Sequence, residues 1–348
     1  MIDLLQELSE AFGPSGHEDD VRDIVMGIVE PLADDVRVDK LGNVIATKRG
    51  RREEVLLLDA HMDEVGFLVS YIDESGFLRL SPLGGWDARV LPAHAITITG
   101  RERRRIRGVI GTLPPHVTQE SERSKAFKLE ELFVDVGARS RAEAEDMGVE
   151  IGSPAVPGYP FERLGEDLVM GKAFDDRAGC AVAIGALRAL RDVETDLTVV
   201  WAFTTSEELG LRGARVAANQ VKAEVAIALE GTTAVDVPGV SGARKLASMG
   251  LGPAVTIADR SIIASRRVLT LLEEVAAKEG IPYQRKLPGG GSTDAGAIQT
   301  TGEGALVGVV SVPCRYIHAP LSLLRPSDLE AAVRLVEAFG RAAGALVG

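Results

Sequence analysis

The chain of 348 residues is predicted to fold as a three-layer α/β domain interrupted by a smaller β-rich domain. Two observations predict the larger domain: uninterrupted apolar runs, typical of strands buried on both faces, alternate with segments whose apolar residues recur at helical spacing. The interruption is predicted because short β-like segments replace helices in the middle of the sequence. The expected strands of the larger domain include residues 55–58, 197–203, 225–229 and 306–312.

Helical segments lie between these strands and at both ends of the chain. Two helices near the start include residues 2–8 and 21–28, and two later ones cover 179–190 and 268–278. A last helix is expected to begin at Ser327, because Ser327 and Glu330 have the spacing of a capping box. Strand and helix in this alternating order favour a sheet with helices on both faces.

The middle of the chain is predicted to be an inserted domain. From residue 68 to residue 162 the segments are short and strand-like, turns separate them, and helical pattern is limited to a run near 140–147. The α/β domain is therefore expected to consist of residues 1–67 and 163–348, which close around the insert. Five arginines between positions 101 and 107 fall in the insert, and a solvated hairpin or an interface explains them better than nucleic-acid binding.

Composition excludes several classes of partner. The chain has 39 basic and 51 acidic residues, a formal charge of −12, so neither nucleic acid nor an anionic membrane is expected to bind it. No apolar stretch is long enough for a membrane span, and the first residues lack the basic region of a signal peptide. Cys180 and Cys314 are too few for a disulfide framework, which indicates reduced thiols in a cytoplasmic protein.

Candidate ligands for a metal begin with His61 and Asp63, directly after the expected strand at 55–58. In an extended chain this spacing of two puts both side chains on one face. A carboxylate beside a histidine fixes its tautomer, as is common around metal ligands. The same pair also occurs without any metal, so the pattern alone leaves both interpretations open.

Two further acidic pairs leave similar alternatives. Asp175 and Asp176 precede a helix rich in small residues, where they are either ligands or a helix cap. Glu207 and Glu208 follow the expected strand at 197–203, where ligands commonly bind in α/β sheets. One of them could hold a metal while its neighbour acts as a base, and a solvated helix start is the alternative.

Glu230 and His318 complete the set. Glu230 ends the expected strand at 225–229, and His318 follows the strand at 306–312. Neither is persuasive alone, but imidazole and carboxylate groups at several strand ends predict one metal site at the carboxyl edge of the sheet. Oxygen and nitrogen ligands without thiolate suit Zn²⁺, Co²⁺ or Mn²⁺ at a hydrolytic site.

A glycine-rich segment at 289–294 has two interpretations. A phosphate-binding loop is disfavoured, because the segment lacks the following lysine and the preceding buried strand. The better interpretation is close approach of the backbone to a substrate. Gly290 and Gly291 would then line a substrate pocket together with Asp294.

Six ordered segments resemble the TET-type aminopeptidases, a family that includes the glutamyl and deblocking aminopeptidases. The similarity extends over nearly the whole chain. It is carried by residues 60–67 (AHMDEVGF), 172–180 (KAFDDRAGC), 205–214 (TSEELGLRGA), 228–239 (ALEGTTAVDVPG), 289–298 (GGGSTDAGAI) and 310–320 (VSVPCRYIHAP). The resemblance implies a cytosolic metallo-exopeptidase with an α/β catalytic domain, an inserted β-rich dimerisation domain, and assembly into dimers or tetrahedral dodecamers.

The resemblance also implies a role for each candidate. Two divalent ions per subunit, zinc or cobalt, would share Asp175 as a bridging ligand. His61 and Glu230 would complete one site, Glu208 and His318 the other, while Asp63 orients His61 and Glu207 is the general base. Many members of the family have aspartate in place of Glu230, so the chain departs from the usual pattern there.

The function expected from this resemblance is removal of N-terminal residues from peptides by a metal-activated water. Two alternatives are a scaffold with structural metals and no catalysis, and another hydrolase on the same fold, such as a cellulase. Assembly through the insert is expected as well, with a charged loop at 119–131 facing an internal chamber or a neighbouring subunit.

Overall fold

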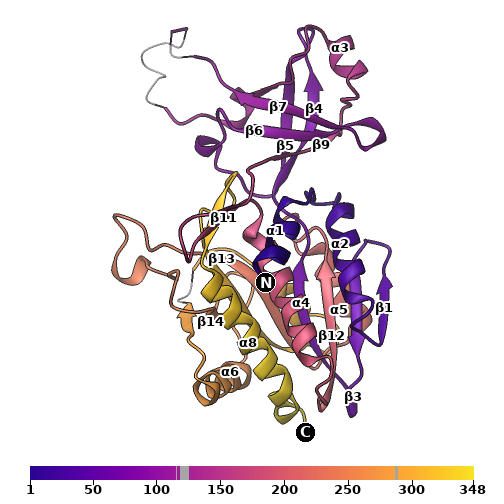
Figure 1. The fold of residues 1–348 in the computed structure, drawn as a ribbon, viewed down its shortest axis with the longest axis vertical. Coiled ribbons are helices and arrows are strands. Elements are labelled where there is room, and N and C mark those ends of the chain that lie inside the picture. The colour runs from indigo at the N-terminus through magenta and orange to yellow at the C-terminus, as the bar shows by residue number, and fades with distance from the viewer. Residues whose placement is uncertain (115, 118–124, 287–288) are drawn as a thin grey trace.

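The structure of the protein is a computed structural model that describes all residues except 115, 118–124 and 287–288. Figure 1 shows a β-barrel standing at one end of a larger part, in which helices flank a central sheet. The N- and C-termini both lie in the larger part, so the barrel is contributed by the middle of the chain.

Within the described residues, the sheet of the larger part has eleven strands of mixed direction. Strands β12, β3, β13 and β16 run parallel in that spatial order, and the remaining strands extend the sheet on both sides, mainly by antiparallel pairing. Its full path is β1-β2-β12-β3-β13-β16-β17-β11-β10, with β14 paired to β16 and β15 paired to β14. Its strands are β1 (Asp35–Val38), β2 (Val44–Lys48), β3 (Arg52–His61), β10 (Glu162–Arg163), β11 (Val169–Gly171), β12 (Leu197–Thr204), β13 (Val225–Thr233), β14 (Ala254–Thr256), β15 (Gln284–Lys286), β16 (Leu306–Arg315) and β17 (Ser322–Leu324).

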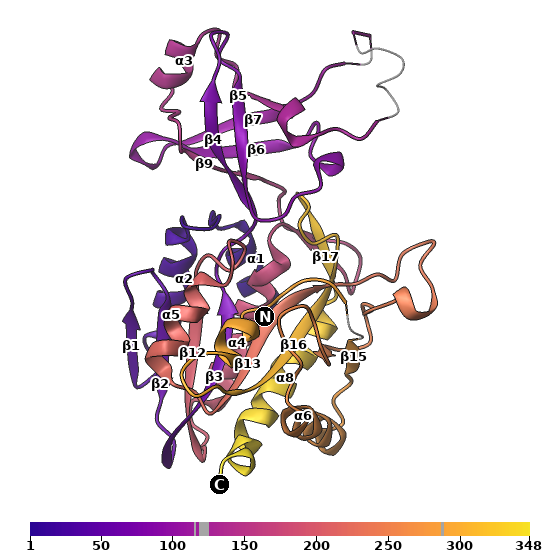
Figure 2. The ribbon, with the colours of Figure 1, turned by 180° about the vertical axis from the view of Figure 1, so that it is seen from behind.

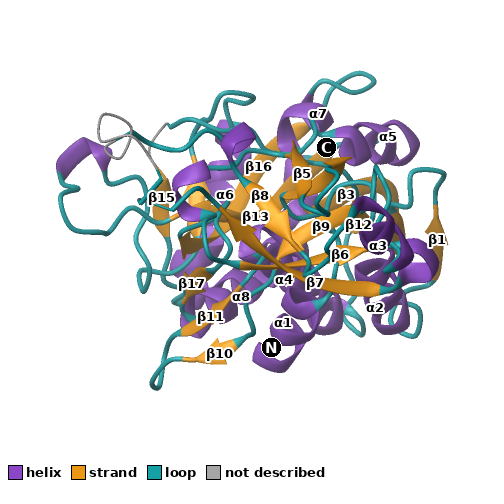
Figure 3. Cartoon of the chain, turned by 90° about the horizontal axis from the view of Figure 1, so that it is seen from above, coloured by secondary structure: helices purple, strands orange, loops and turns teal. Residues whose placement is uncertain are grey.

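Helices cover both faces of this sheet. Seen from above, α4, α8 and α1 lie on one side of the strands, while α5 and α7 lie on the other (Figure 3). The α-helices of this part are α1 (Ile2–Glu10), α2 (Asp19–Val29), α4 (Phe174–Leu190), α5 (Arg212–Val221), α6 (Arg266–Glu279), α7 (Ala295–Gln299) and α8 (Pro326–Ala342).

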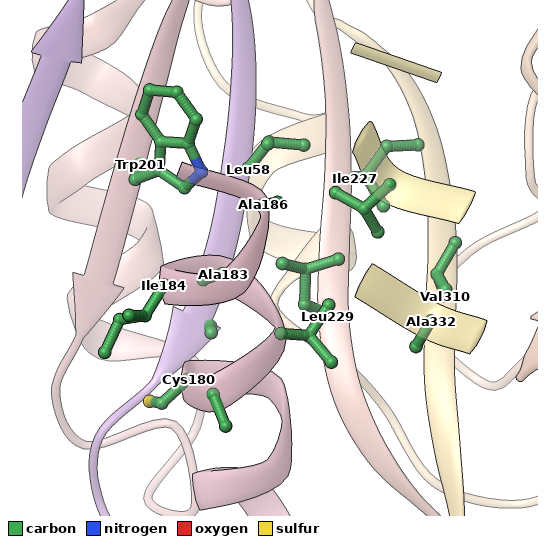
Figure 4. Close-up of a cluster of buried hydrophobic side chains, with 14 of the residues drawn as sticks. Leu58, Cys180, Ala183, Ile184, Ala186, Trp201, Ile227, Leu229, Val310 and Ala332 are labelled. Atoms are coloured by element: carbon green, nitrogen blue, oxygen red, sulfur yellow. The ribbon is translucent and has the colours of Figure 1, made fainter. Parts of the chain in front are cut away.

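Two hydrophobic cores show why the chain forms three layers. Successive side chains of a strand point to opposite faces, so Leu56 and Leu58 of β3 join the core beneath α4 and α8, whereas Leu57 joins the core beneath α5 and α7. Figure 4 shows the first core, where Trp201, Ile227 and other strand side chains meet small residues of α4. Gly185 allows α4 to approach α8, since a Cβ there would lie 2.8 Å from Val333.

The expected strands and helices of the larger part are present, with one correction at the last helix. Helix α8 begins at Pro326, one residue before the expected start, and Arg325 occupies the N-cap without a side-chain cap. The expected capping box is therefore wrong. Proline at the first helical position begins the helix instead, because its fixed φ suits a helix and its missing N–H would have had no partner there.

The middle of the chain forms a closed barrel in the order β4-β5-β8-β7-β6-β9. Figure 2 shows it from the opposite side, connected to the larger part through the ends of β4 and β9. Its interior is apolar and includes Phe67, Ile96 and Val134. The elements are β4 (Gly66–Ile72), β5 (Leu78–Leu83), β6 (Ala95–Thr99), β7 (Arg105–Gly111), β8 (Phe133–Asp135), β9 (Pro154–Pro157), α3 (Arg141–Asp146) and the 3₁₀ turns η1 (Ala88–Val90), η2 (Arg101–Arg103) and η3 (Leu129–Glu131).

The arginine-rich segment ties the barrel to the larger part. Arg103 and Arg105 form ion pairs with Asp20 of α2, and the Arg105 guanidinium lies 4.1 Å from the centre of the Phe12 ring. The first part of the expected loop at 119–131, residues 119–124, lies outside the described residues, and its orientation stays a prediction. Among the residues that the structure describes, none of the helices is long and apolar enough to cross a membrane.

Candidate metal centre

The carboxyl ends of the four parallel strands bring the candidate residues together. His61 is the last residue of β3 and is paired in register with Thr204, the last residue of β12. Glu230 lies in β13 opposite Ser311 of β16. The residues that line one cavity of about 650 Å³ at this edge include His61, Asp175, Glu207, Glu208, Glu230 and His318.

Asp175 lies between the two histidines. Its Oδ1 is 3.4 Å from Nε2 of His61, and its Oδ2 is 3.4 Å from Nε2 of His318. The backbone at Asp175 is extended rather than helical, and the peptide bond to Asp176 is cis. Gly231 permits this approach, because a Cβ on Gly231 would lie only 2.9 Å from Cα of Asp175.

The glutamates divide between the two histidines. Oε1 of Glu208 lies 3.1 Å from Nε2 of His318, and Oε2 of Glu230 lies 3.8 Å from Nε2 of His61. Oε2 of Glu207 is 4.0 Å from Nε2 of His61. Asp175, Glu208 and His318 thus form one compact group, whereas His61 forms groups with Glu230 and with the two adjacent glutamates.

Asp176 lies beside His61 and Glu230, at a distance that a ligand could have. Both of its oxygens are nevertheless engaged: Oδ1 accepts a hydrogen bond from the amide of Gly179 at 2.9 Å, and Oδ2 accepts one from the amide of His61 at 3.1 Å. The first contact has the spacing of a helix N-cap. The side chain therefore ties the start of α4 to the end of β3.

Asp63 is fully buried behind His61, Glu207 and Glu208. Its Oδ1 is 3.3 Å from Nδ1 of His61, and it accepts hydrogen bonds from the amide of Glu207 and from the hydroxyl of Ser15. Burial alone would raise the pKa of Asp63, but the neighbouring His61 ring and the hydrogen bonds from Ser15 and from the amide of Glu207 hold the pKa below its usual value. Asp63 is thus an anion that fixes its neighbours in place.

Burial and repulsion by other acidic groups dominate the pKa of two glutamates of the site. Burial, together with nearby acidic groups, raises the pKa of Glu207 and of Glu230 well above the ordinary value. Burial would lower the pKa of His318, but the carboxylates of Asp175 and Glu208 raise it to about 11. The site thus concentrates more negative charge than its two imidazoles can balance, which favours cations.

The donor set fits divalent metal ions. Ligand atoms about 2.1 Å from one tetrahedral ion lie roughly 3.4 Å from one another. The separations around Asp175 and His318 are 3.1 to 3.4 Å, and the pair formed by His61 and Glu230 is slightly wider at 3.8 Å. Imidazole nitrogen with carboxylate oxygen is a common ligand set for zinc and for neighbouring transition metals.

The glycine-rich segment lies partly where the sequence predicted. Gly290 and Gly291 line the cavity. Asp294 does not, which corrects the expectation that it lines a substrate pocket: its side chain is fully buried and accepts a hydrogen bond from Thr204 at 2.8 Å. The backbone turns into α7 directly after Asp294, and the carboxylate of Asp294 faces the interior of the fold. The backbone amide of Asp294 donates a hydrogen bond to Oε1 of Glu230 at 3.3 Å.

Several polar residues of the cavity were not assigned a role from the sequence. Lys286, Asp259 and Thr293 line it together with the candidate ligands. Lys286 is the last residue of β15, a strand of three residues that pairs with β14. No motif surrounds Lys286 in the sequence, and only the pairing of these short strands brings it to the cavity.

Comparison with known proteins finds that this chain is similar to aminopeptidases. The family model described as M42 glutamyl aminopeptidase matches residues 42–335. A TET aminopeptidase structure from a marine sediment archaeon, Thaumarchaeota archaeon SCGC AB-539-E09, is 40% identical with a TM-score of 0.95, over 98% of this chain and 95% of that chain. The Pyrococcus furiosus lysyl aminopeptidase is 36% identical over 97% of both chains. The TET1 peptidase of Pyrococcus horikoshii, described as assembling into a tetrahedron or a large octahedral shell, is 33% identical with a TM-score of 0.87, over 97% and 98% of the two chains.

Proposed function

Because the chain belongs to the M42 glutamyl aminopeptidase family, whose members are metal-dependent peptide hydrolases, we propose that it is a dinuclear aminopeptidase. The observation that carries the proposal is the position of Asp175, whose two oxygens face different histidines at 3.4 Å. A carboxylate placed in this way can bridge two ions.

The ligands divide into two sets. His61 and Glu230 would hold one ion and His318 and Glu208 the other, with Asp175 shared between them. Glu230 is one methylene longer than the aspartate usual in the family, and its 3.8 Å separation from His61 is compatible with that extra length. Zn²⁺ and Co²⁺ suit this set of imidazole and carboxylate ligands, since no thiolate takes part.

Two such ions, when bound, lower the pKa of a water molecule and polarise the scissile carbonyl. Glu207 is the candidate general base, because its carboxylate reaches into the cavity beside both sets of ligands. It would accept the proton of the attacking water and later deliver it to the leaving amine. Asp63 would hold His61 and the backbone of Glu207 in the positions that this proton transfer requires.

The free N-terminal amine of a peptide is a cation, and the excess of carboxylates in the cavity would attract it. This preference for a charged amine supports removal of residues from the N-terminus rather than internal cleavage. Cleavage of a glycoside, the alternative hydrolysis, needs an acid and a second carboxylate free to act on a sugar. The carboxylates of this cavity are instead grouped around the two histidines.

Hydrolysis of a panel of aminoacyl nitroanilides, with and without chelator, tests the proposal. We expect cleavage that chelator abolishes and that added Zn²⁺ or Co²⁺ restores. Bound metal without any cleavage would indicate a scaffold, and cleavage that persists after the metals are removed would contradict the metal-dependent mechanism.

We also propose that the protein is a homo-oligomer built from dimers, in which the barrel (the expected insert at 68–162) is the dimerisation domain. The barrel exposes apolar side chains near η1, β7 and the segment that follows β7, namely Val90, Val109, Leu113, Val117 and Phe127. A tetrahedral dodecamer, as described for the Pyrococcus horikoshii relative, is the assembly we favour. Sedimentation that finds a fully active monomer at micromolar concentration would contradict this.

Two buried free cysteines agree with a reducing, cytoplasmic location.

A further inference from the structure

The two histidines of the candidate metal centre are oriented by different parts of the molecule. Nδ1 of His61 faces Asp63, within the same α/β part. Nδ1 of His318 instead lies 3.0 Å from the carbonyl oxygen of Gly85, which belongs to the barrel between β5 and η1. A carbonyl oxygen can only accept a hydrogen bond, so Nδ1 of His318 carries a proton, and Nε2, which faces Asp175 and Glu208, is the ring nitrogen that would bind a metal ion.

The residue before Gly85 approaches the second ligand of the same group. Gly84 has φ +82°, and a Cβ added to it would lie 3.2 Å from both Cβ and Oε2 of Glu208. The same Cβ would lie 2.7 Å from Val65. Any side chain at position 84 would therefore displace this segment from Glu208 and His318.

Trp86 fixes the segment to the base of the barrel. Its indole N–H donates to the carbonyl of Gly66 at 3.0 Å, and its ring stacks on Phe67 with centroids 4.9 Å apart. Phe67 belongs to the barrel core, so the segment is anchored to the barrel rather than to the α/β part. Trp86, Asp175 and His318 also line one small cavity together.

We propose that residues 84–86 of the barrel are a positioning element for the metal site formed by His318 and Glu208, and not for the site formed by His61. The proposal rests on the ligand sets of the proposed function. Partners that orient a metal-bound histidine typically change metal affinity by about 10- to 100-fold. The His318 side chain is 36% exposed and that of His61 only 2%, so His318 depends more on this single partner for a fixed orientation.

A matched pair of glycine variants tests the proposal. Gly137 is also in the barrel and has φ +80°, but a Cβ there would meet no atom within 4 Å. Gly84→Ala and Gly137→Ala therefore impose similar backbone strain, while only the first presses on the metal site. We expect competition between the protein and a chelator for Zn²⁺ to show that Gly84→Ala weakens one of two ions by about 10- to 100-fold. Gly137→Ala should bind both ions like the unmodified protein.

Histidine variants identify which ion is affected. In a His318→Ala background, Gly84→Ala should cause no further loss of Zn²⁺, because the site it acts on is already impaired. In a His61→Ala background it should weaken the remaining ion by the same factor. Trp86→Phe keeps an aromatic ring but loses the indole N–H, and it should lower the affinity for the same ion by a smaller factor. This variant replaces Gly84→Ala in the test if Gly84→Ala does not fold.

Three results would overturn the proposal: equal Zn²⁺ binding by Gly84→Ala and Gly137→Ala, equal weakening of both ions by Gly84→Ala, or weakening confined to the site of His61. If Gly84→Ala does not fold, unchanged Zn²⁺ binding by Trp86→Phe would overturn it as well. Failure of the proposed function is distinguishable, because it would appear in the unmodified protein as binding of fewer than two ions.

Discussion

The carboxylate of Asp63 accepts a hydrogen bond from the backbone amide of Glu207 at 2.9 Å. Its other oxygen lies 3.2 Å from the amide of Glu208, and the same carboxylate faces His61. One buried anion therefore sets the positions of a candidate ligand at the end of β3 and of two glutamates that follow β12. The ends of two neighbouring strands are held together at the point where the chemistry is expected.

Replacing Asp63 tests this relationship. In Asp63→Asn the side chain loses its charge, and its amide group must face backbone N–H donors. We expect the affinity for the ion at His61 to fall by about 10- to 100-fold and turnover to fall with it. Metal content after dialysis against chelator, together with turnover, measures both effects. Ser15→Ala is the control, since it removes a single 2.6 Å hydrogen bond to Asp63 and should have a smaller effect. Unchanged metal content in Asp63→Asn would contradict this role.

A second prediction concerns the contribution of a buried charge cluster to the stability of the fold. Glu64 is buried and forms ion pairs with Lys172 at 2.6 Å and with the fully buried Arg177 at 3.2 Å. Glu64→Gln would leave these cations without a counter-charge, a change that typically costs about 3 to 5 kcal/mol. We expect a clear fall in the midpoint of thermal unfolding.

The control is an exposed pair. Asp3→Asn breaks the ion pair between Asp3 and Arg163, whose side chains are 94% and 64% exposed respectively. Exposed pairs of this kind contribute less than about 1 kcal/mol to stability. Equal melting temperatures for Glu64→Gln and Asp3→Asn would contradict a stabilising role for the buried cluster.

A third prediction concerns pH. Burial, and then repulsion by Asp63, raises the pKa of Glu18 from 4.5 to about 7. Between these values the folded protein keeps a proton that the unfolded chain has released, so stability falls as pH rises, by about 1.4 kcal/mol for each pH unit. Glu18→Gln removes this loss and can still accept the hydrogen bond from the amide of Ser206. Relative to the unmodified protein, the variant should therefore gain in melting temperature from pH 5 to pH 8.

Glu7→Gln makes the same chemical change at an exposed position of α1 and supplies the comparison for the substitution itself. A difference between Glu18→Gln and the unmodified protein that stays constant across this pH range would show that Glu18 does not retain a proton in the folded state.

The fold was largely predictable because its central strands are continuous apolar runs. The segments at 55–58, 197–203, 225–229 and 306–312 all form the middle of the sheet, and their parallel order brings their carboxyl ends to one edge. Strands of two or three residues, such as β14 and β17, carry too few side chains for a period to be recognised. Their existence depends on pairing with longer strands, which local sequence does not encode.

The candidate site was predicted in the same uneven way. His61, Asp175 and His318 converge as the sequence indicated, since each follows or begins a recognisable element. Asp294 was misplaced because the glycines before it suggest exposure, whereas its own side chain turns inward to Thr204. The contact between Gly85 and His318 joins residues 233 positions apart, and only the docking of the barrel on the α/β part creates it.

The most direct test of the dinuclear mechanism compares two adjacent glutamates. Glu207→Gln keeps the shape of the side chain but cannot accept a proton, and general-base assistance is worth about 10²- to 10⁴-fold in rate. We predict that Glu207→Gln retains two ions and loses turnover by at least 100-fold, or about 3 kcal/mol. Glu208→Gln, whose parent carboxylate lies 3.1 Å from His318, should instead lose affinity for one ion, and added metal should partly restore its turnover. Metal content and turnover measured side by side decide the matter: if Glu207→Gln loses an ion while Glu208→Gln keeps both, the assignment of base and ligand is contradicted.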